Sequence, residues 1–278
     1  MLPRSNYIVA AHWEAVLRRI AIILALVAVT MPLSPSAGAA TVTVAAAGDI
    51  ARPSFGLPQQ QTADLVTAFN PTAVFALGDT QYENGELANF QTYYDASWGA
   101  FKSTTFPIPG NHEYQTPGAA GYYTYFGAAA GDPSKGYYSF DLGDWHVVAL
   151  NTNCSKIDCT AQKSWMVADL AADPHLCDMV IYHAANLKWP RRKAEAAGVD
   201  VALTASRHVY ERWAPESGLV RFIVGTGGRS LGTLDPAAVV GVRQYGVVRL
   251  TLDATAYSWS FVDITGAVRD SGSGSCHS

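Results

Sequence analysis

Short apolar runs recur along the chain, and most of them end at a glycine or a polar side chain. The first two runs are residues 41–47 and 72–77, and residues 59–69 between them carry apolar side chains at helical spacing. A strand, a helix and a second strand in this order predict a parallel βαβ unit. Residues 86–101 also have helical spacing and are expected to form an exposed helix.

The rest of the chain is expected to be rich in strands. Residues 138–141 and 145–150 flank Gly143 and predict a hairpin. Further apolar runs predict strands at 106–109, 179–182, 199–203, 220–224, 246–252 and 257–264. No repeat or linker interrupts the pattern. Together the elements predict one α/β domain over residues 40–278, a two-sheet sandwich flanked by helices.

The first 39 residues differ from this pattern. Basic residues precede an apolar run at 20–29, and the small residues Ala37-Gly38-Ala39 follow it. These features predict a secretory signal peptide over residues 1–39. A retained membrane anchor is the alternative, although about 20 apolar residues are needed to span a bilayer. The mature protein is therefore expected to be secreted, with no stable membrane span.

Composition narrows the class of protein. The 278 residues are 49% hydrophobic and 15% charged, and the formal net charge is −4. This apolar content supports a packed core, which excludes a disordered tail or linker. The acidic balance argues against a nucleic-acid-binding protein, which usually carries a basic stripe.

Four cysteines lie beyond the predicted signal peptide. An oxidising compartment favours disulfides. Cys154 and Cys159 close a short loop, so we pair them with each other and pair Cys177 with Cys276. A zinc site built from all four cysteines is the alternative, but the chain lacks the paired C-x2-C spacing of such sites.

Potential metal ligands follow five of the apolar runs. They are Asp49, Asp79, Asn111-His112, His183 and His208. The carboxyl ends of neighbouring strands meet at one edge of an α/β sheet, so these side chains are expected to converge. Carboxylate, amide and imidazole groups together suit Zn, Fe or Mn. Each residue taken alone is more often part of an ordinary turn, a cap or the packing than a metal ligand, so the prediction depends on their common position.

The motifs around these residues resemble the calcineurin-like metallophosphoesterases. They are Gly48-Asp49, Gly78-Asp79-Thr80-Gln81-Tyr82, Gly110-Asn111-His112-Glu113, His183 and His208-Val209-Tyr210-Glu211-Arg212. Tyr82 and the last motif are similar to the purple acid phosphatase-like branch, including its small secreted bacterial members. The resemblance covers nearly all of residues 40–278. It implies a metallophosphoesterase-type β-sandwich with the metal site at the carboxyl ends of the strands.

The resemblance also implies a role for each residue. The implied ligands are Asp49, Asp79, Tyr82 and His208 for a first metal ion, and Asp79, Asn111 and His183 for a second. His112 would protonate the leaving group or stabilise the phosphoryl oxygens, and Asn111 and Arg207 are further candidates for phosphate contact. Up to two ions of Fe, Zn or Mn would generate the attacking hydroxide. The expected substrate is a small-molecule or surface phosphate ester.

The chain departs from the resemblance at several positions, and one of these departures affects a metal ligand. The family carries Gly-His-x-His where this chain has Ala205-Ser206-Arg207-His208. Ser206 therefore replaces a ligand of the second metal ion, and a neutral hydroxyl is a poor substitute for imidazole. We expect a secreted phosphoesterase with a weakened second metal site. The alternative is a non-catalytic secreted relative that binds a ligand or a single metal ion.

Three other features are expected to have no catalytic role. Gly225-Thr226-Gly227-Gly228 lacks the Lys-Ser/Thr end of a phosphate-binding loop and is expected to be a tight turn at the rim of the site. Arg191-Arg192-Lys193 is expected on a solvated helix face. His146 and His175 fit no motif and are expected to be structural or at the surface.

Overall fold

The structure is a computed structural model that describes residues 41–54 and 58–277. The predicted signal peptide, residues 1–39, lies outside the described residues. Within them, no helix combines the length and the apolar character that crossing a membrane requires.

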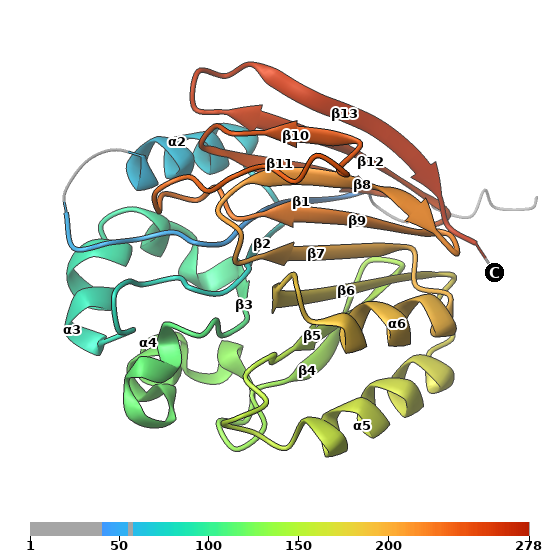
Figure 1. Cartoon of the computed structure of the whole chain (residues 1–278), viewed down its shortest axis with the longest axis horizontal. Coiled ribbons are helices and arrows are strands. Elements are labelled where there is room, and N and C mark those ends of the chain that lie inside the picture. Colours follow the sequence, from blue (N-terminus) through green and yellow to red (C-terminus); the bar gives the residue numbers. More distant parts are fainter. Residues whose placement is uncertain (1–40, 55–57, 278) are drawn as a thin grey trace, which may run out of the picture. The chain divides into compact units, whose positions relative to one another are not determined.

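Two mixed β-sheets form the centre of the domain, as the sequence predicts (Figure 1). Their strand orders are β13-β12-β11-β1-β2-β3 and β10-β8-β9-β7-β6-β5-β4. The first sheet consists of β1 (Val42–Ala47), β2 (Ala73–Ala76), β3 (Thr105–Pro107), β11 (Gly246–Leu252), β12 (Ala256–Asp263) and β13 (Val268–Ser275). The second consists of β4 (Tyr138–Leu142), β5 (Trp145–Leu150), β6 (Cys177–Ala184), β7 (Val201–Ala205), β8 (Tyr210–Glu216), β9 (Leu219–Val224) and β10 (Val240–Val242).

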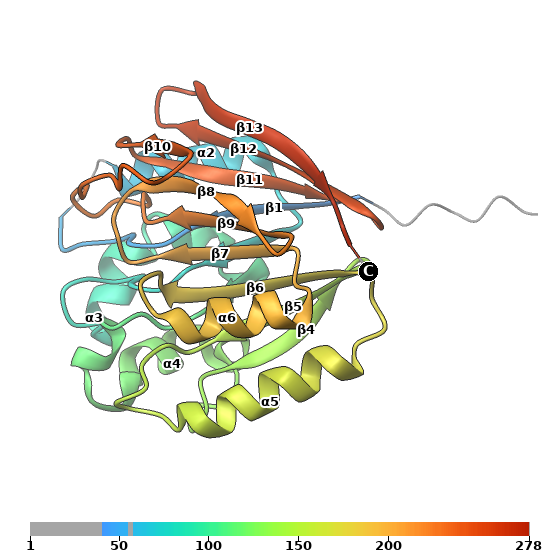
Figure 2. The same ribbon diagram turned by 45° about the vertical axis from the view of Figure 1, so that its right-hand side comes forward.

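Each sheet contains a block of parallel strands. In the first sheet β1, β2 and β3 are parallel neighbours, and the predicted βαβ unit is confirmed by α2 (Gln59–Phe69) between β1 and β2. In the second sheet β5, β6, β7 and β9 are parallel. The arrowheads of β6, β7 and β9 point the same way in Figures 1 and 2. The loops after the parallel strands of a sheet therefore share one edge.

Two apolar layers stabilise this arrangement. Fully buried side chains such as Phe75, Phe222 and Phe261 belong to the larger layer, to which both sheets contribute. On the second sheet a smaller layer joins Val180 of β6 to Met166 of α5 (Cys159–Ala172) and to α6 (Lys188–Ala197). Both helices lie along this sheet in Figure 2. Burial of this kind stabilises the fold by about 25 cal/mol per Å² of apolar surface.

The segment expected to form one exposed helix is broken and partly buried. It contains α3 (Leu87–Asn89), a π-helical stretch (Phe90–Tyr94) and a 3-10 stretch (Trp98–Thr104). The apolar side chains of Phe90 and Tyr94 are fully buried, because α4 (Ala120–Phe126) packs its aromatic rings against them. The prediction of one continuous, exposed helix over residues 86–101 was therefore wrong.

Both predicted disulfides form. The loop disulfide joins Cys154 to Cys159 between β5 and α5, and the tail disulfide joins Cys177 at the start of β6 to Cys276 after β13. The described chain has no free cysteine, so a zinc site built from the four thiolates does not form. The tail disulfide links the last strand of the first sheet to the middle of the second.

Candidate metal centre

Five of the predicted ligands converge where β1, β2, β6 and β7 end. The Tyr82 hydroxyl lies 2.7 Å from Asp49 Oδ1, 3.0 Å from Asp79 Oδ2 and 3.3 Å from His208 Nε2. His183 Nε2 lies 3.4 Å from Asp79 Oδ2. We call these five residues the central cluster. Their position confirms the expectation that side chains after neighbouring strands meet at one edge.

Both histidines of the central cluster are held in an orientation suited to ligating a cation. His183 Nδ1 lies 2.8 Å from the carbonyl oxygen of Leu77, and His208 Nδ1 lies 2.9 Å from that of Ser230. A ring that donates Nδ1–H to a carbonyl presents the lone pair of Nε2 on its other side. His183 Nε2 is buried and has no hydrogen-bond partner among the described residues. A cation bound between the carboxylates would satisfy it.

The central cluster places negative charge where water cannot screen it. Asp49 and Asp79 are buried, and within the described residues their ion pairs are with histidines only. Burial opposes ionisation of Asp79, but the charges and hydrogen bonds of His183 and His112 together outweigh it and lower the pKa of Asp79 to about 2. Burial also opposes protonation of His183, yet Asp79 raises the pKa of this histidine to about 10. The carboxylates thus require a positive charge, which a proton or a metal ion supplies.

Tyr82 lies between the two carboxylates. Burial, followed by the charges of Asp49 and Asp79, raises the pKa of Tyr82 far above its ordinary value. Without a cation the phenol therefore keeps its proton and donates a hydrogen bond to one of the two carboxylates. A bound cation would reverse this balance, because it stabilises phenolate and carboxylates together.

The backbone at this edge is strained. Asp49 (φ 57°), Asp79 (φ 46°), Ser206 (φ 71°) and His208 (φ 54°) all have left-handed conformations. Each such residue costs of order 1–3 kcal/mol, and strained residues of this kind cluster at functional sites. Four of them around one group of side chains indicate a functional site independently of the motifs.

Two glycines allow the loops to approach this closely. A Cβ on Gly110 would lie 2.1 Å from Asp79 Oδ1, and one on Gly225 would lie 2.4 Å from Asp49 Oδ2. Neither contact is possible for any other residue. The turn over residues 225–228 therefore packs against Asp49, consistent with its expected position beside the site.

Glu113 organises the two loops, a role that the motif analysis missed. Its buried carboxylate accepts hydrogen bonds from the amides of Asp79 (2.9 Å), Thr80 (2.7 Å) and Gly110 (2.6 Å). The Thr80 hydroxyl and the Gln81 amide also donate to it. Burial, followed by the charge of Asp79, raises the pKa of Glu113. In the sequence, the only signal for this structural role was the place of Glu113 as the last residue of the Gly-Asn-His-Glu motif.

His112 lies at the edge of the central cluster. Its amide donates to Asp79 Oδ1 (2.8 Å), and its Nδ1 lies 2.5 Å from the carbonyl oxygen of Glu83. Its ring centroid is 4.4 Å from that of Tyr82, and its Nε2 is 3.9 Å from Asp79 Oδ2. The ring is partly exposed, so Nε2 can meet both the cluster and a ligand from solvent. The Asn111 side chain is exposed and has no hydrogen bond to the described part of the chain.

Ser206 and Arg207, the two residues before His208, differ in role. The Ser206 amide donates to Asp49 Oδ2 (2.8 Å), so the backbone still supports the cluster. The Arg207 guanidinium is engaged elsewhere, 3.1 Å from Asp235 and 3.5 Å from Glu211. These ion pairs compete with the phosphate contact expected of Arg207.

Arg229 is a second residue that sequence reasoning missed. Its guanidinium lies 4.7 Å from the centroid of the Tyr82 ring and donates to both carboxylate oxygens of Glu83, at 2.7 and 3.1 Å. Its amide donates to the carbonyl oxygen of Asp49 (2.8 Å). Arg229 and His112 both pack on Tyr82. No motif identified Arg229, because it follows the loop at 225–228 and not a strand.

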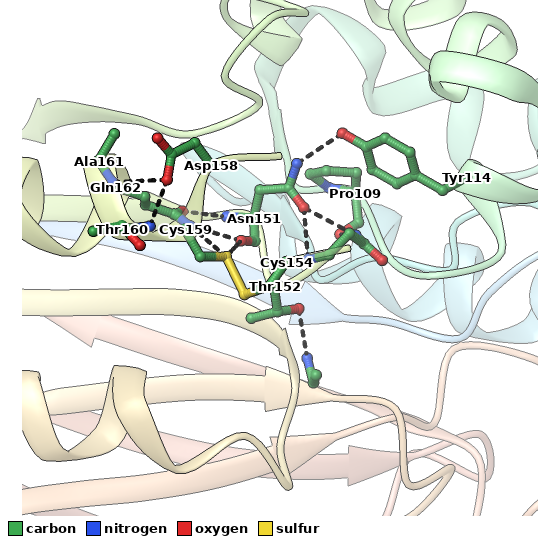
Figure 3. The surroundings of a disulfide bond; sticks show 12 residues. Pro109, Tyr114, Asn151, Thr152, Cys154, Asp158, Cys159, Thr160, Ala161 and Gln162 are labelled. Atoms are coloured by element: carbon green, nitrogen blue, oxygen red, sulfur yellow. Dashed lines mark hydrogen bonds between the residues drawn. A yellow bond between two sulfur atoms is a disulfide. The ribbon is translucent and has the colours of Figure 1, made fainter. Parts of the chain in front are cut away.

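The loop disulfide holds a segment that braces this edge (Figure 3). Within that segment Asn153 Nδ2 donates to the carbonyl oxygen of Gly110 (3.1 Å), and the Thr152 hydroxyl accepts from the amide of Ala184 (3.2 Å). Figure 3 also shows Asn151 between Gln162 and Tyr114. Residues 152–153, immediately before the loop disulfide, therefore connect two of the loops that carry the candidate ligands.

The two mixed sheets flanked by helices form the metallophosphoesterase fold, and comparisons with solved structures agree. A purple acid phosphatase from yellow lupin (Lupinus luteus) seeds has a TM-score of 0.70 at 19% identity, over 85% of this chain and 54% of that one. This chain thus spans about half the length of the lupin enzyme. A dimetal phosphatase from Danio rerio has a TM-score of 0.62 at 12% identity, over 85% and 99% of the two chains.

A third solved structure with this fold is described in other terms. GAP50, the anchor in the inner membrane complex of Plasmodium, has a TM-score of 0.62 at 11% identity, over 86% of this chain and 90% of that one. No family profile matches the sequence, and no curated protein does. At these identities the comparisons establish the fold, and the chemistry depends on the residues themselves.

Proposed function

We propose that this protein is a secreted, metal-dependent phosphoesterase whose metal site is the central cluster. One observation carries the proposal: two buried carboxylates and the Nε2 atoms of two oriented histidines converge, with no lysine or arginine paired to them in the described residues. Oxygen and imidazole ligands together suit Zn, Fe or Mn. The loop and tail disulfides are compatible with an extracellular protein.

In this proposal each residue has a defined task. Asp49, Tyr82 and His208 would hold a first ion, Asp79 would be shared, and His183 would hold a second ion with the exposed side chain of Asn111. A bound ion supplies a Lewis acid that activates water and stabilises charge on the phosphate. His112 donates a proton to the leaving oxygen from Nε2, while its Nδ1–H remains on the Glu83 carbonyl.

Arg229 is proposed as the cationic contact for the substrate phosphate. Its guanidinium packs on Tyr82 beside His112 and is partly exposed. A planar guanidinium suits phosphate oxygens, and its ion pair with the exposed Glu83 can exchange for a phosphate at little cost. Arg229→Met should raise KM for an aryl phosphate more than it lowers kcat.

Turnover of an aryl phosphate tests the proposed function. The purified protein, freed of metal and then supplied with Zn²⁺, Mn²⁺ or Fe²⁺, should hydrolyse p-nitrophenyl phosphate, and chelation should abolish the reaction. Asp79→Asn should remove activity, while Asp64→Asn on the exposed face of α2 should keep it. The proposal fails if no metal gives turnover above a protein-free blank, or if both variants behave alike.

Ser206 favours a second candidate, a non-catalytic relative that holds one metal ion or a ligand. The position supplies only its amide to the cluster, so the second ion lacks one imidazole. Ser206→His separates the two candidates. A rise in bound metal together with a rise in turnover supports a phosphoesterase with a weakened second site. A rise in bound metal without any turnover supports the non-catalytic relative, and unchanged stoichiometry contradicts the ligand assignment.

A further inference from the structure

A second group of histidines and aspartates lies at the other end of β6 from the central cluster. His146 is near the start of β5, Asp141 is on the neighbouring β4, and Asp173 and His175 lie between α5 and β6. We call these four residues, together with Asp169 of α5, the distal cluster. Neither histidine belongs to any motif of the metallophosphoesterase resemblance.

Four ligand atoms of the distal cluster point at one another. His146 Nδ1 lies 2.8 Å from Asp141 Oδ1 and 3.6 Å from Asp173 Oδ1, and His175 Nδ1 lies 2.7 Å from the same oxygen of Asp173. All four atoms lie within 4.8 Å of one another. A tetrahedral zinc ion with bonds of about 2.0–2.1 Å separates its ligands by about 3.3 Å. The observed separations bracket this value.

His146 is oriented as metal-ligating histidines are. Its Nε2 lies 3.0 Å from Asp169 Oδ2, and a ligating histidine commonly donates its other N–H to a carboxylate in this way. With that proton on Nε2, the lone pair of Nδ1 faces Asp141 and Asp173. Two carboxylate oxygens beside a lone pair repel it, so a positive charge is needed there, either a proton or a metal ion.

The charge of the surroundings favours the metal ion. Asp178 adds a further carboxylate, whose Oδ1 is buried without a hydrogen-bond partner among the described residues. Within the described chain, the ion pairs of the cluster's aspartates are with histidine only. Two protonated histidines would still leave the three carboxylates of Asp141, Asp169 and Asp173 with excess negative charge.

We propose that the distal cluster binds one Zn²⁺ through Asp141, His146, Asp173 and His175. Two imidazole nitrogens and two carboxylate oxygens form a donor set that zinc accepts in tetrahedral geometry. Asp169 acts as a positioning residue that fixes the ring of His146. The ion would tie the β4–β5 hairpin to the connection between α5 and β6, which is a structural role separate from the central cluster.

Calorimetric titration of the full chain with Zn²⁺ tests the proposal with matched variants. Asp141→Asn removes a ligand, and Asp144→Asn makes the same charge change two residues past the end of β4, outside the cluster. Any zinc bound at the central cluster contributes equally to both. Asp144→Asn should bind like the parent protein, and Asp141→Asn should lose one high-affinity equivalent. Asp169→Asn should keep that equivalent with affinity lowered about 10- to 100-fold.

A second variant guards against misfolding of the first. His175→Gln changes a partly exposed side chain and should lose the same equivalent, with an unchanged circular dichroism spectrum. Identical zinc titrations for the parent, Asp141→Asn, Asp144→Asn and His175→Gln would overturn the proposal and assign the positive charge to protonated histidines.

Discussion

Replacing Glu113 with glutamine keeps the size of the side chain and should still destabilise the protein strongly. The carboxylate accepts five hydrogen bonds: Oε2 faces the amides of Asp79 and Gly110, and Oε1 faces the Thr80 amide and hydroxyl and the Gln81 amide. The amide group of glutamine must replace one of the two oxygens. In either orientation its NH2 meets at least two donors.

The expected loss of stability follows from this count. A hydrogen bond to a charged acceptor contributes about 1.5–3 kcal/mol, so two lost bonds correspond to about 3–6 kcal/mol. Burial raises the pKa of Glu113, so removing its charge returns part of this energy. We therefore expect Glu113→Gln to lower the free energy of unfolding by about 3 kcal/mol.

Urea denaturation, followed by tryptophan fluorescence, measures this loss. Glu86→Gln is the matched control, because Glu86 is exposed and, among the described residues, its carboxylate accepts a hydrogen bond only from Asn89; it should change stability by less than about 0.5 kcal/mol. A Glu113→Gln protein as stable as the control would refute the idea that this carboxylate organises the two ligand loops.

Three further outcomes can be measured on the same protein. Replacing both cysteines of the tail disulfide by serine should cost about 4.7 kcal/mol, against about 2 kcal/mol for the loop disulfide, because their sequence separations are 99 and 5; the reverse order in urea denaturation would contradict this. Gly110→Ala should lower metal affinity at the central cluster at least about 10-fold, because the new Cβ would lie 2.1 Å from Asp79 Oδ1. Equilibrium dialysis measures this affinity, and an unchanged value would contradict the expectation. Burial alone would raise the pKa of Asp270, but hydrogen bonds from Arg212, Tyr210 and Trp259 lower it; its ionised form therefore stabilises the fold above about pH 4, and that stability is lost as the pH falls. Asp270→Asn should flatten this acid limb of the unfolding free energy, and an unchanged limb would count against the assignment.

The strands and the meeting of the candidate ligands at one edge could be predicted because they depend on local patterns. Apolar runs ending in Gly-Asp at Asp49 and Asp79 identify both the strands and their carboxyl ends. The parallel topology then brings those ends together without further information. The disulfide pairing was equally predictable, since Cys154 and Cys159 are close in the chain.

Other parts depend on tertiary contacts that a single sequence does not display. The burial of Phe90 and Tyr94 requires the aromatic side chains of α4, which lie much further along the sequence. Glu113 and Arg229 act through backbone amides and the ring of Tyr82, which no motif encodes. His146 and His175 are 29 residues apart in the sequence but belong to the same cluster, because β5 and β6 are parallel neighbours.

The direction in which the charged side chain of Arg207 points also could not be predicted from the sequence. Its place beside His208 suggests a phosphate contact, yet its guanidinium pairs with Asp235 and Glu211. Asp235 lies in a loop whose position only the folded chain reveals. A basic residue next to a motif therefore predicts charge near the site, but not the direction of the side chain.

Anomalous diffraction from crystals grown with Mn²⁺ or Zn²⁺ tests the central claim most directly. The account predicts an anomalous peak at the central cluster, within about 2.0–2.2 Å of oxygens of Asp49 and Asp79 and of a histidine Nε2. The same peak should be absent in Asp79→Asn crystals. A structure at saturating metal with no peak at the central cluster would contradict the claim that these residues form a metal centre.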